Sequence, residues 1–105
     1  MANVTTTVRA RLIQAKVPTI YNLSMPTSGT EYSQALSENT KKIMVKTRDR
    51  TAKLRIAFVS GNTNTLWITL EAGAVFFEEN LDLEGATIYL QSDKNGQVVE
   101  ILQWV

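Results

Sequence analysis

Five carboxylates stand close together in one stretch of the sequence, ITLEAGAVFFEENLDLEG, which runs from residue 68 to residue 85. Clustered carboxylates act as general acids and bases in hydrolases, or as ligands for hard cations such as calcium. A third interpretation is an acidic rim on a surface that contacts another protein. The five residues are Glu71, Glu78, Glu79, Asp82 and Glu84.

The spacing of these carboxylates disfavours both kinds of chemistry. Glu78 and Glu79 are neighbours in a predicted strand, so their side chains point to opposite faces and do not flank one substrate bond. The run EENLDLE lacks the glycine that an EF-hand loop needs at its sixth position. Leu81 and Leu83 are expected to point inward, which leaves the acids beside them in solvent. We therefore interpret the stretch as a rim for protein contact.

The composition excludes several classes of active site. The 105 residues include no cysteine and no histidine, which rules out cysteine nucleophiles, Ser-His-Asp triads and Cys/His zinc sites. Glycine-rich phosphate-binding motifs are absent as well. We expect a single domain that is not an enzyme and needs no cofactor or metal. No apolar run approaches a membrane span, and the N-terminus lacks the apolar core of a signal peptide, so we expect a soluble, non-exported chain.

The charge of the chain is unevenly distributed along the sequence. The net charge is only +1, yet residues 1–60 carry ten basic and three acidic groups (net +7), and residues 61–105 carry one basic and seven acidic groups (net −6). Such a split can steer one copy onto another, basic face to acidic face. Alternatively, antiparallel strands bring the two halves together within one monomer, which is the interpretation we favour.

From Lys41 onward, apolar residues recur with a period of two, which is typical of β-strands. The segments are KKIMVKTR, AKLRIAFV, TLWITL, VFFEE, ATIYLQ and QVVEILQW, with turn residues between them. Short, regularly spaced strands without a helical period predict an all-β fold, either a β-sandwich or a small barrel. The residues expected to face the core are Ile43, Val45 and Thr47, then Leu54, Ile56 and Phe58, then Leu66, Ile68 and Leu70, and finally Ala86, Ile88 and Leu90.

The N-terminal part of the chain has a different character. Residues 1–29 are rich in β-branched residues and interrupted by Pro18 and Pro26, which predicts an extended arm with one possible strand around Ile20–Leu23. Such an arm has little core of its own, so we expect a neighbouring subunit or a partner to hold it. The alternative is that it docks on its own sandwich as an edge strand. The predicted domains are thus the arm, 1–29, and a β-sandwich, 30–105.

The last predicted strand is apolar on both faces. In QVVEILQWV, Val99 and Ile101 are expected to face the core, which places Val98, Leu102 and Trp104 together on the opposite face. A strand of this kind is either fully buried or covered by another molecule. We predict an apolar interface stripe, which a partner or the N-terminal arm covers.

Nucleic-acid and sugar binding are weaker hypotheses. The stretch KKIMVKTRDRTAKLR would place five basic side chains on one sheet face, but that face offers no aromatic ring for base stacking. Nucleic acid is therefore an unfavoured partner. Trp67 and Trp104 could form a sugar-stacking patch, although core or interface roles are more common for such residues. The five basic residues are Lys42, Lys46, Arg48, Lys53 and Arg55.

Two long runs resemble a group of small virion proteins of tailed bacteriophages. They are EYSQALSENTKKIMVKTRDRTAKLRIAF and TLWITLEAGAVFFEENLDLEGATIYLQSDKNGQVVEILQW. The resemblance covers roughly Thr30 to Trp104 and consists of a strand-and-turn pattern, without a chemical motif. The chain departs from the pattern at Ser37–Glu38, where proline or glycine often stands, which puts the local turn in question.

The resemblance implies a single antiparallel, jelly-roll-like β-sandwich that attaches to a phage particle as a homo-oligomer, with a trimer favoured. It implies a capsid decoration, or cement, protein that stabilises the shell of major capsid protein on the virion surface after synthesis in the bacterial cytoplasm. A head–tail adaptor, a tail or fibre attachment module, and a glycan- or nucleic-acid-binding β module are the alternatives. The predicted contact residues are Arg9, Arg11 and Lys16 of the arm, Glu78, Glu79, Asp82 and Glu84 of the acidic rim, and Val98, Leu102 and Trp104 of the last strand.

Overall fold

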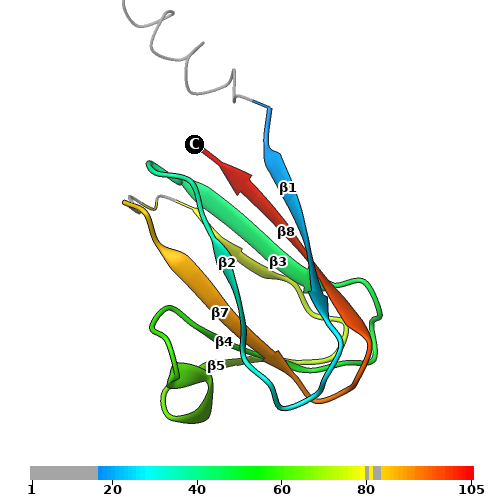
Figure 1. Cartoon of the computed structure of the whole chain (residues 1–105). Helices are drawn as coiled ribbons and strands as arrows, with labels where there is room; N and C mark the ends of the chain where they lie inside the picture. Colours follow the sequence, from blue (N-terminus) through cyan, green and yellow to red (C-terminus); the bar gives the residue numbers. More distant parts are fainter. Residues whose placement is uncertain (1–16, 80, 82–83) are drawn as a thin grey trace, which may run out of the picture.

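The chain folds into two antiparallel sheets that face each other (Figure 1). The computed structural model describes residues 17–79, 81 and 84–105. The first sheet has the order β1-β8-β3-β6 and the second the order β2-β7-β4-β5. The strands are β1 (Thr19–Met25), β2 (Tyr32–Ala35), β3 (Lys42–Thr47), β4 (Leu54–Ala57), β5 (Ile68–Leu70), β6 (Phe76–Glu78), β7 (Thr87–Ser92) and β8 (Gln97–Trp104), with a 3-10 turn η1 at Asn62–Asn64 between β4 and β5.

The strand order is that of a jelly roll, in which eight strands form two sheets through Greek-key connections. The chain passes from one sheet to the other between β1 and β2, between β2 and β3, and between β3 and β4. The prediction of an all-β, jelly-roll-like sandwich is therefore confirmed. In the described part of the chain no α-helix is present.

The core lies between the sheets and is built from alternate residues of the long strands. Each of these strands turns one side chain inward and the next outward, so a period of two in the sequence becomes a buried row in the structure. Most of the residues expected to face the core are in that row. Ile43, Val45, Leu54, Ile56, Ile88, Leu90, Val99 and Ile101 are all at most 1% exposed.

Three residues predicted to be in the core are instead on the surface. Phe58 is 42%, Leu66 75% and Ile68 52% exposed. Strand β4 ends at Ala57, one residue before Phe58, and β5 does not begin until Ile68. Ile68 begins β5, the last strand of its sheet, whereas Leu70 on the same face of this strand is buried in the core.

Part of the predicted arm belongs to the first sheet. All seven residues of β1 pair with β8, from Thr19 opposite Gln103 to Met25 opposite Gln97. This is the strand expected around Ile20–Leu23, and Figure 1 shows β1 alongside β8. The sheet thus includes residues from within the segment 1–29. Strand β2 was not foreseen, because its sequence YSQA contains only two weakly apolar residues.

A buried glutamine closes the connection between β2 and β3. Gln103, at the inner face of β8, accepts a hydrogen bond from the Ser37 backbone N–H at 2.9 Å and donates one to the Ser37 hydroxyl. The Thr40 hydroxyl donates to the Ser37 carbonyl at 2.6 Å. Asn39 occupies the turn with a left-handed φ of 62°, a conformation that asparagine tolerates. The turn at Ser37–Glu38 therefore forms without proline or glycine.

Replacing this glutamine should destabilise the fold. Gln103→Leu keeps the side-chain size but leaves part-buried polar groups of Ser37 without their partner, which costs about 1–3 kcal/mol where water cannot replace it. Urea unfolding followed by circular dichroism measures the change in free energy of unfolding. Gln34→Leu, on the half-buried side of β2, is the matched control and should change it by less than about 0.5 kcal/mol. Equal losses in both variants would contradict the role of Gln103.

Candidate functional site

An apolar row crosses the outer face of the first sheet from one edge to the other. Ile20 of β1 lies opposite Leu102 of β8, Leu102 opposite Met44 of β3, and Met44 opposite Phe77 of β6. Residues paired in an antiparallel ladder place their side chains on the same face. The four side chains therefore form a continuous row at right angles to the strands.

Trp104 widens this row at one end. It lies two residues after Leu102 on the same face of β8, and its ring meets the Phe77 ring edge-on with centroids 6.4 Å apart. The Lys42 ammonium lies 5.5 Å from the centroid of the Trp104 ring. Ile20 is 66% and Phe77 48% exposed, and the other members are half-buried. We call Ile20, Met44, Phe77, Leu102 and Trp104 the apolar stripe.

The apolar stripe runs across the strands, whereas the prediction had it along β8. Val98 shares the outer face with Leu102 and Trp104, as expected, but Glu100 stands between Val98 and Leu102. Glu100 forms ion pairs with Lys46 at 3.4 Å and with Arg48 at 3.2 Å. A polar row therefore borders the stripe on the side of Val98.

These ion pairs bear on the uneven charge of the sequence. Lys46 and Arg48 belong to the basic half and Glu100 to the acidic half, and Lys46 lies directly opposite Glu100 in the ladder. Lys53 of the basic half likewise approaches Glu71 of the acidic half at 3.5 Å. Part of the split is thus neutralised between neighbouring strands of one monomer, as the favoured interpretation expected.

The acidic rim is only partly within the described residues. Glu78 ends β6, and Glu78, Glu79 and Glu84 are exposed, while Asp82 lies outside the described residues, as does Leu83. Leu81 packs against the core, as predicted. The arm residues Arg9, Arg11 and Lys16 also lie outside the described part of the chain.

The basic patch predicted as one nucleic-acid-binding face is divided between two faces. Lys42, Lys46 and Arg48 accompany β3 in the first sheet, whereas Lys53 and Arg55 accompany β4 in the second. The chain changes sheets at the turn between these strands, and outward residues of the two sheets point in opposite directions. The expectation of a single basic face is therefore wrong.

The two tryptophans are divided in the same way. Trp104 belongs to the apolar stripe of the first sheet, whereas Trp67 precedes β5 and stacks on Arg55, an outward residue of β4. The hypothetical sugar-stacking patch of Trp67 and Trp104 does not form. Sequence reasoning had no means of seeing this, since it depends on which sheet each strand joins.

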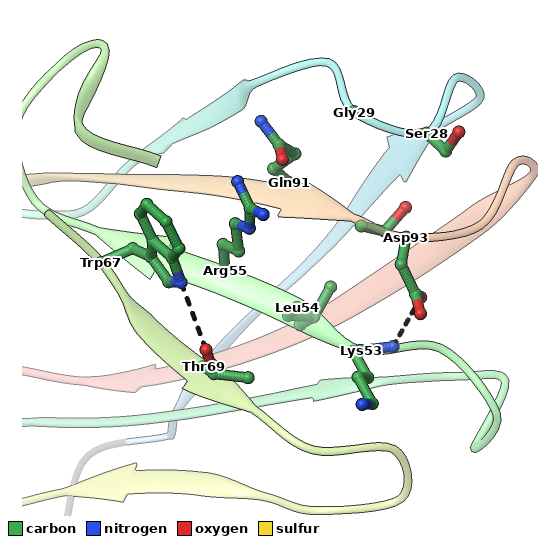
Figure 2. Close-up of a pocket in the computed structure, with 10 residues that line it drawn as sticks. Ser28, Gly29, Lys53, Leu54, Arg55, Trp67, Thr69, Gln91 and Asp93 are labelled. Atoms are coloured by element: carbon green, nitrogen blue, oxygen red, sulfur yellow. Dashed lines mark hydrogen bonds between the residues drawn. The ribbon is translucent and has the colours of Figure 1, made fainter. Parts of the chain in front are cut away.

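A hollow of about 420 Å³ lies on the outer face of the second sheet (Figure 2). Its lining includes Trp67, Arg55, Gln91, Asp93 and Lys53. Figure 2 shows Arg55 beside the Trp67 ring at one end and Asp93 at the other, with Gln91 between them. In size and composition the hollow is suited to a small polar ligand such as a sugar.

Most polar groups of this hollow are, however, already bonded within the chain. The Arg55 guanidinium lies 4.1 Å from the Trp67 ring centroid and donates to the Thr63 carbonyl at 3.3 Å. Gln91 donates to the Asn64 side chain at 3.1 Å, and the Trp67 indole N–H donates to the Thr69 hydroxyl at 3.2 Å. These bonds hold the loop around η1 against the sheet.

Glu31 fixes the same loop from the other side. Its carboxylate accepts hydrogen bonds from the Thr63 hydroxyl at 2.7 Å and from the Gly61 backbone N–H at 2.9 Å. The bond from Thr63, followed by the one from Gly61, lowers the pKa of Glu31. Arg55 and Gln91 in the wall of the hollow therefore have a structural role, which is to hold the loop around η1 in place.

Two general features complete the description of the surface. Within residues 17–79, 81 and 84–105, no three acidic side chains come together in a way that would hold a metal ion. The same residues include no helix with the length and apolar character needed to cross a membrane.

Comparison with known proteins gives little guidance. No family description matches the sequence, and no curated protein matches it. Among solved structures, the chain is similar to the solution NMR structure of a de novo designed double-stranded beta-helix. The two are 16% identical over 86% of this chain and 100% of the designed chain, with a TM-score of 0.49. We base no argument on a similarity of this size.

The bond to Arg48, together with the bond and charge of Lys46, lowers the pKa of Glu100. A lowered folded-state pKa means that the carboxylate stabilises the fold above its unfolded-state pKa, and that this stabilisation is lost as the pH falls through the folded-state value. Glu100→Gln should therefore lower the melting temperature at pH 7 and have progressively less effect below about pH 4.5.

Thermal unfolding between pH 2.5 and pH 7 measures this effect. Glu79→Gln removes an exposed carboxylate that forms no ion pair within the described residues, and it should leave the melting temperature at pH 7 within error. A pH-independent loss in Glu100→Gln would show that the side chain acts through something other than its charge.

Proposed function

We propose that the chain is a structural, non-enzymatic virion protein of a tailed bacteriophage, and specifically a capsid decoration protein that binds the shell of major capsid protein. The observation that carries the proposal is the apolar stripe, which lies on the outer face of the first sheet with Ile20 and Phe77 exposed. The resemblance of residues 30–104 to small phage virion proteins suggests the partner. The resulting location is the outer surface of the capsid.

The apolar stripe has the properties of a protein-contact surface. Two aromatic rings and three aliphatic or thioether side chains form it, and sheet pairing fixes the backbone that carries all five, so no backbone ordering is needed on binding. Burying such side chains contributes about 25 cal/mol for each Å² of apolar surface removed from water. Lys42 at the edge and the Glu100 ion pairs beside the row provide the polar surroundings that orient a partner.

The alternatives are distinguished by the partner they require. A head–tail adaptor or a tail or fibre attachment module would use the same stripe on another part of the particle. A glycan-binding module would use the hollow at Trp67, where the guanidinium of Arg55 already lies on the indole ring. Because Arg55 covers the face of the indole ring on which a sugar would stack, the stripe is favoured over the hollow as the main binding surface.

Removing apolar side chains from the stripe should weaken attachment to the particle. In Phe77→Ser with Leu102→Ser, each substitution removes roughly 1.5–3 kcal/mol of apolar burial, so we expect affinity to fall at least about tenfold. Purified chain is mixed with virions that lack it, and the bound fraction is measured by co-sedimentation. Electron microscopy of the wild-type complex then shows whether the chain occupies the capsid, the neck or the tail.

Ser33→Ala, on the exposed side of β2 in the other sheet, is the control and should bind like the wild type. Circular dichroism confirms that every variant is folded. Absence of the wild-type chain from purified virions, together with no binding to them, would refute the virion assignment. Binding at the neck or tail would refute decoration of the capsid.

A further inference from the structure

A second apolar feature lies at an edge of the sandwich, away from the hollow at Trp67. A groove of about 270 Å³ opens between the free edges of the two sheets. Its apolar lining includes Phe58, Ile68 and Phe76, and among the described residues that line it Glu78 is the one with a charge. The groove is therefore suited to a peptide that combines apolar side chains with positive charge.

The strands on either side of the groove have backbone groups available for pairing. Among the described residues, strand β6 is the last of the first sheet and β5 the last of the second, and each pairs with a neighbour on one side only. An unpaired strand edge binds an added strand through backbone hydrogen bonds, and pockets between side chains select its sequence. Both elements of such a site, free edge and apolar pocket, are present here.

The segment that precedes β1 has the complementary sequence. In VTTTVRARLIQAK, residues 4–16, Val8, Ala10 and Leu12 alternate with Arg9 and Arg11, and no acidic residue occurs. In an extended conformation the apolar residues lie on one face and the arginines on the other. That pattern matches an apolar groove whose lining includes the exposed carboxylate of Glu78.

The geometry favours the groove of a second copy over the groove of the same chain. In the order β1-β8-β3-β6, β1 and β6 are at opposite edges, about 14 Å apart at the usual strand spacing. Between them, the Lys41 N–H donates to the Trp104 carbonyl and the Leu81 N–H donates to the Lys41 carbonyl, so this end of the sheet is occupied.

The sequence of the segment points the same way. Residues 4–16 include no glycine, proline, asparagine, aspartate or serine, the residues that form tight turns, so this segment is suited to a single straight strand, and a change of direction falls at Pro18, between it and β1. As a straight strand, its 13 residues span about 43 Å at roughly 3.3 Å per residue. That length is sufficient to reach a neighbouring molecule.

We propose that residues 4–16 of one copy bind as an added strand in the β5–β6 groove of a second copy. Val8 and Leu12 fill the space beside Phe58, Ile68 and Phe76, and the arginines face the acidic rim. Because the donated segment and the groove are different surfaces, the contact is heterologous, and repeating it around an axis closes a ring.

This inference concerns self-assembly and uses a different surface from the apolar stripe, so the two proposals can fail separately.

The chain has no cysteine, so a contact between two copies can be trapped as a disulfide between two introduced cysteines. Leu12→Cys and isotopically labelled Ile68→Cys are mixed, oxidised mildly and analysed by non-reducing electrophoresis and mass spectrometry of the linked peptides. We expect at least tenfold more mixed two-chain product than when Leu12→Cys is mixed with Ser33→Cys at the opposite edge.

Two further measurements settle which molecule supplies the strand. A chain with both Leu12→Cys and Ile68→Cys should form products of several chains, and deletion of residues 2–14 should convert the oligomer into a monomer by light scattering. Internally linked single chains, equal linking at Ser33→Cys, or an unchanged mass after the deletion would each overturn the inference. Leu102→Ser should leave the linking unchanged, whereas it weakens particle binding.

Discussion

The antiparallel pairing of β8 with β1 on one side and β3 on the other determines the layout of the first sheet. This ladder is unbroken over the length of β8 and places Gln97, Val99, Ile101 and Gln103 inside and the residues between them outside. A shift of one residue would exchange the two sets and put glutamate in the core. The register of this one strand therefore fixes both the buried core and the outer face.

The same register generates the apolar stripe. Leu102 has apolar neighbours on both sides because strand pairing places Ile20 of β1 and Met44 of β3, which are distant from it in the sequence, directly opposite it. Glu100, two residues earlier, meets Lys46 by the same rule, and the ion pair separates Val98 from the stripe. An apolar row and a charged row thus lie side by side on the outer face, which makes that face asymmetric along the strands.

The two outer faces of the sandwich differ because a loop occupies one of them. The segment around η1 folds onto the second sheet and is held by Glu31, Arg55 and Gln91. No corresponding loop covers the stripe within the described residues, so Ile20 and Phe77 remain exposed and the other members half-buried. At the β5–β6 edge, short strands leave a groove that is likewise open. A single small domain therefore presents two separate apolar surfaces, one flat and one grooved.

The sequence by itself determined the all-β class and most of the core, because alternation within a strand depends only on local backbone geometry. Ile43, Val45, Ile88 and Leu90 are buried where the period of two placed them. Sequence also identified Leu102 and Trp104 as outward apolar residues. Only the tertiary structure decided which strands share a sheet, and therefore that Trp67 and Trp104, or Lys46 and Lys53, lie on different faces. Strand pairing joins residues distant in the chain, and no local pattern records it.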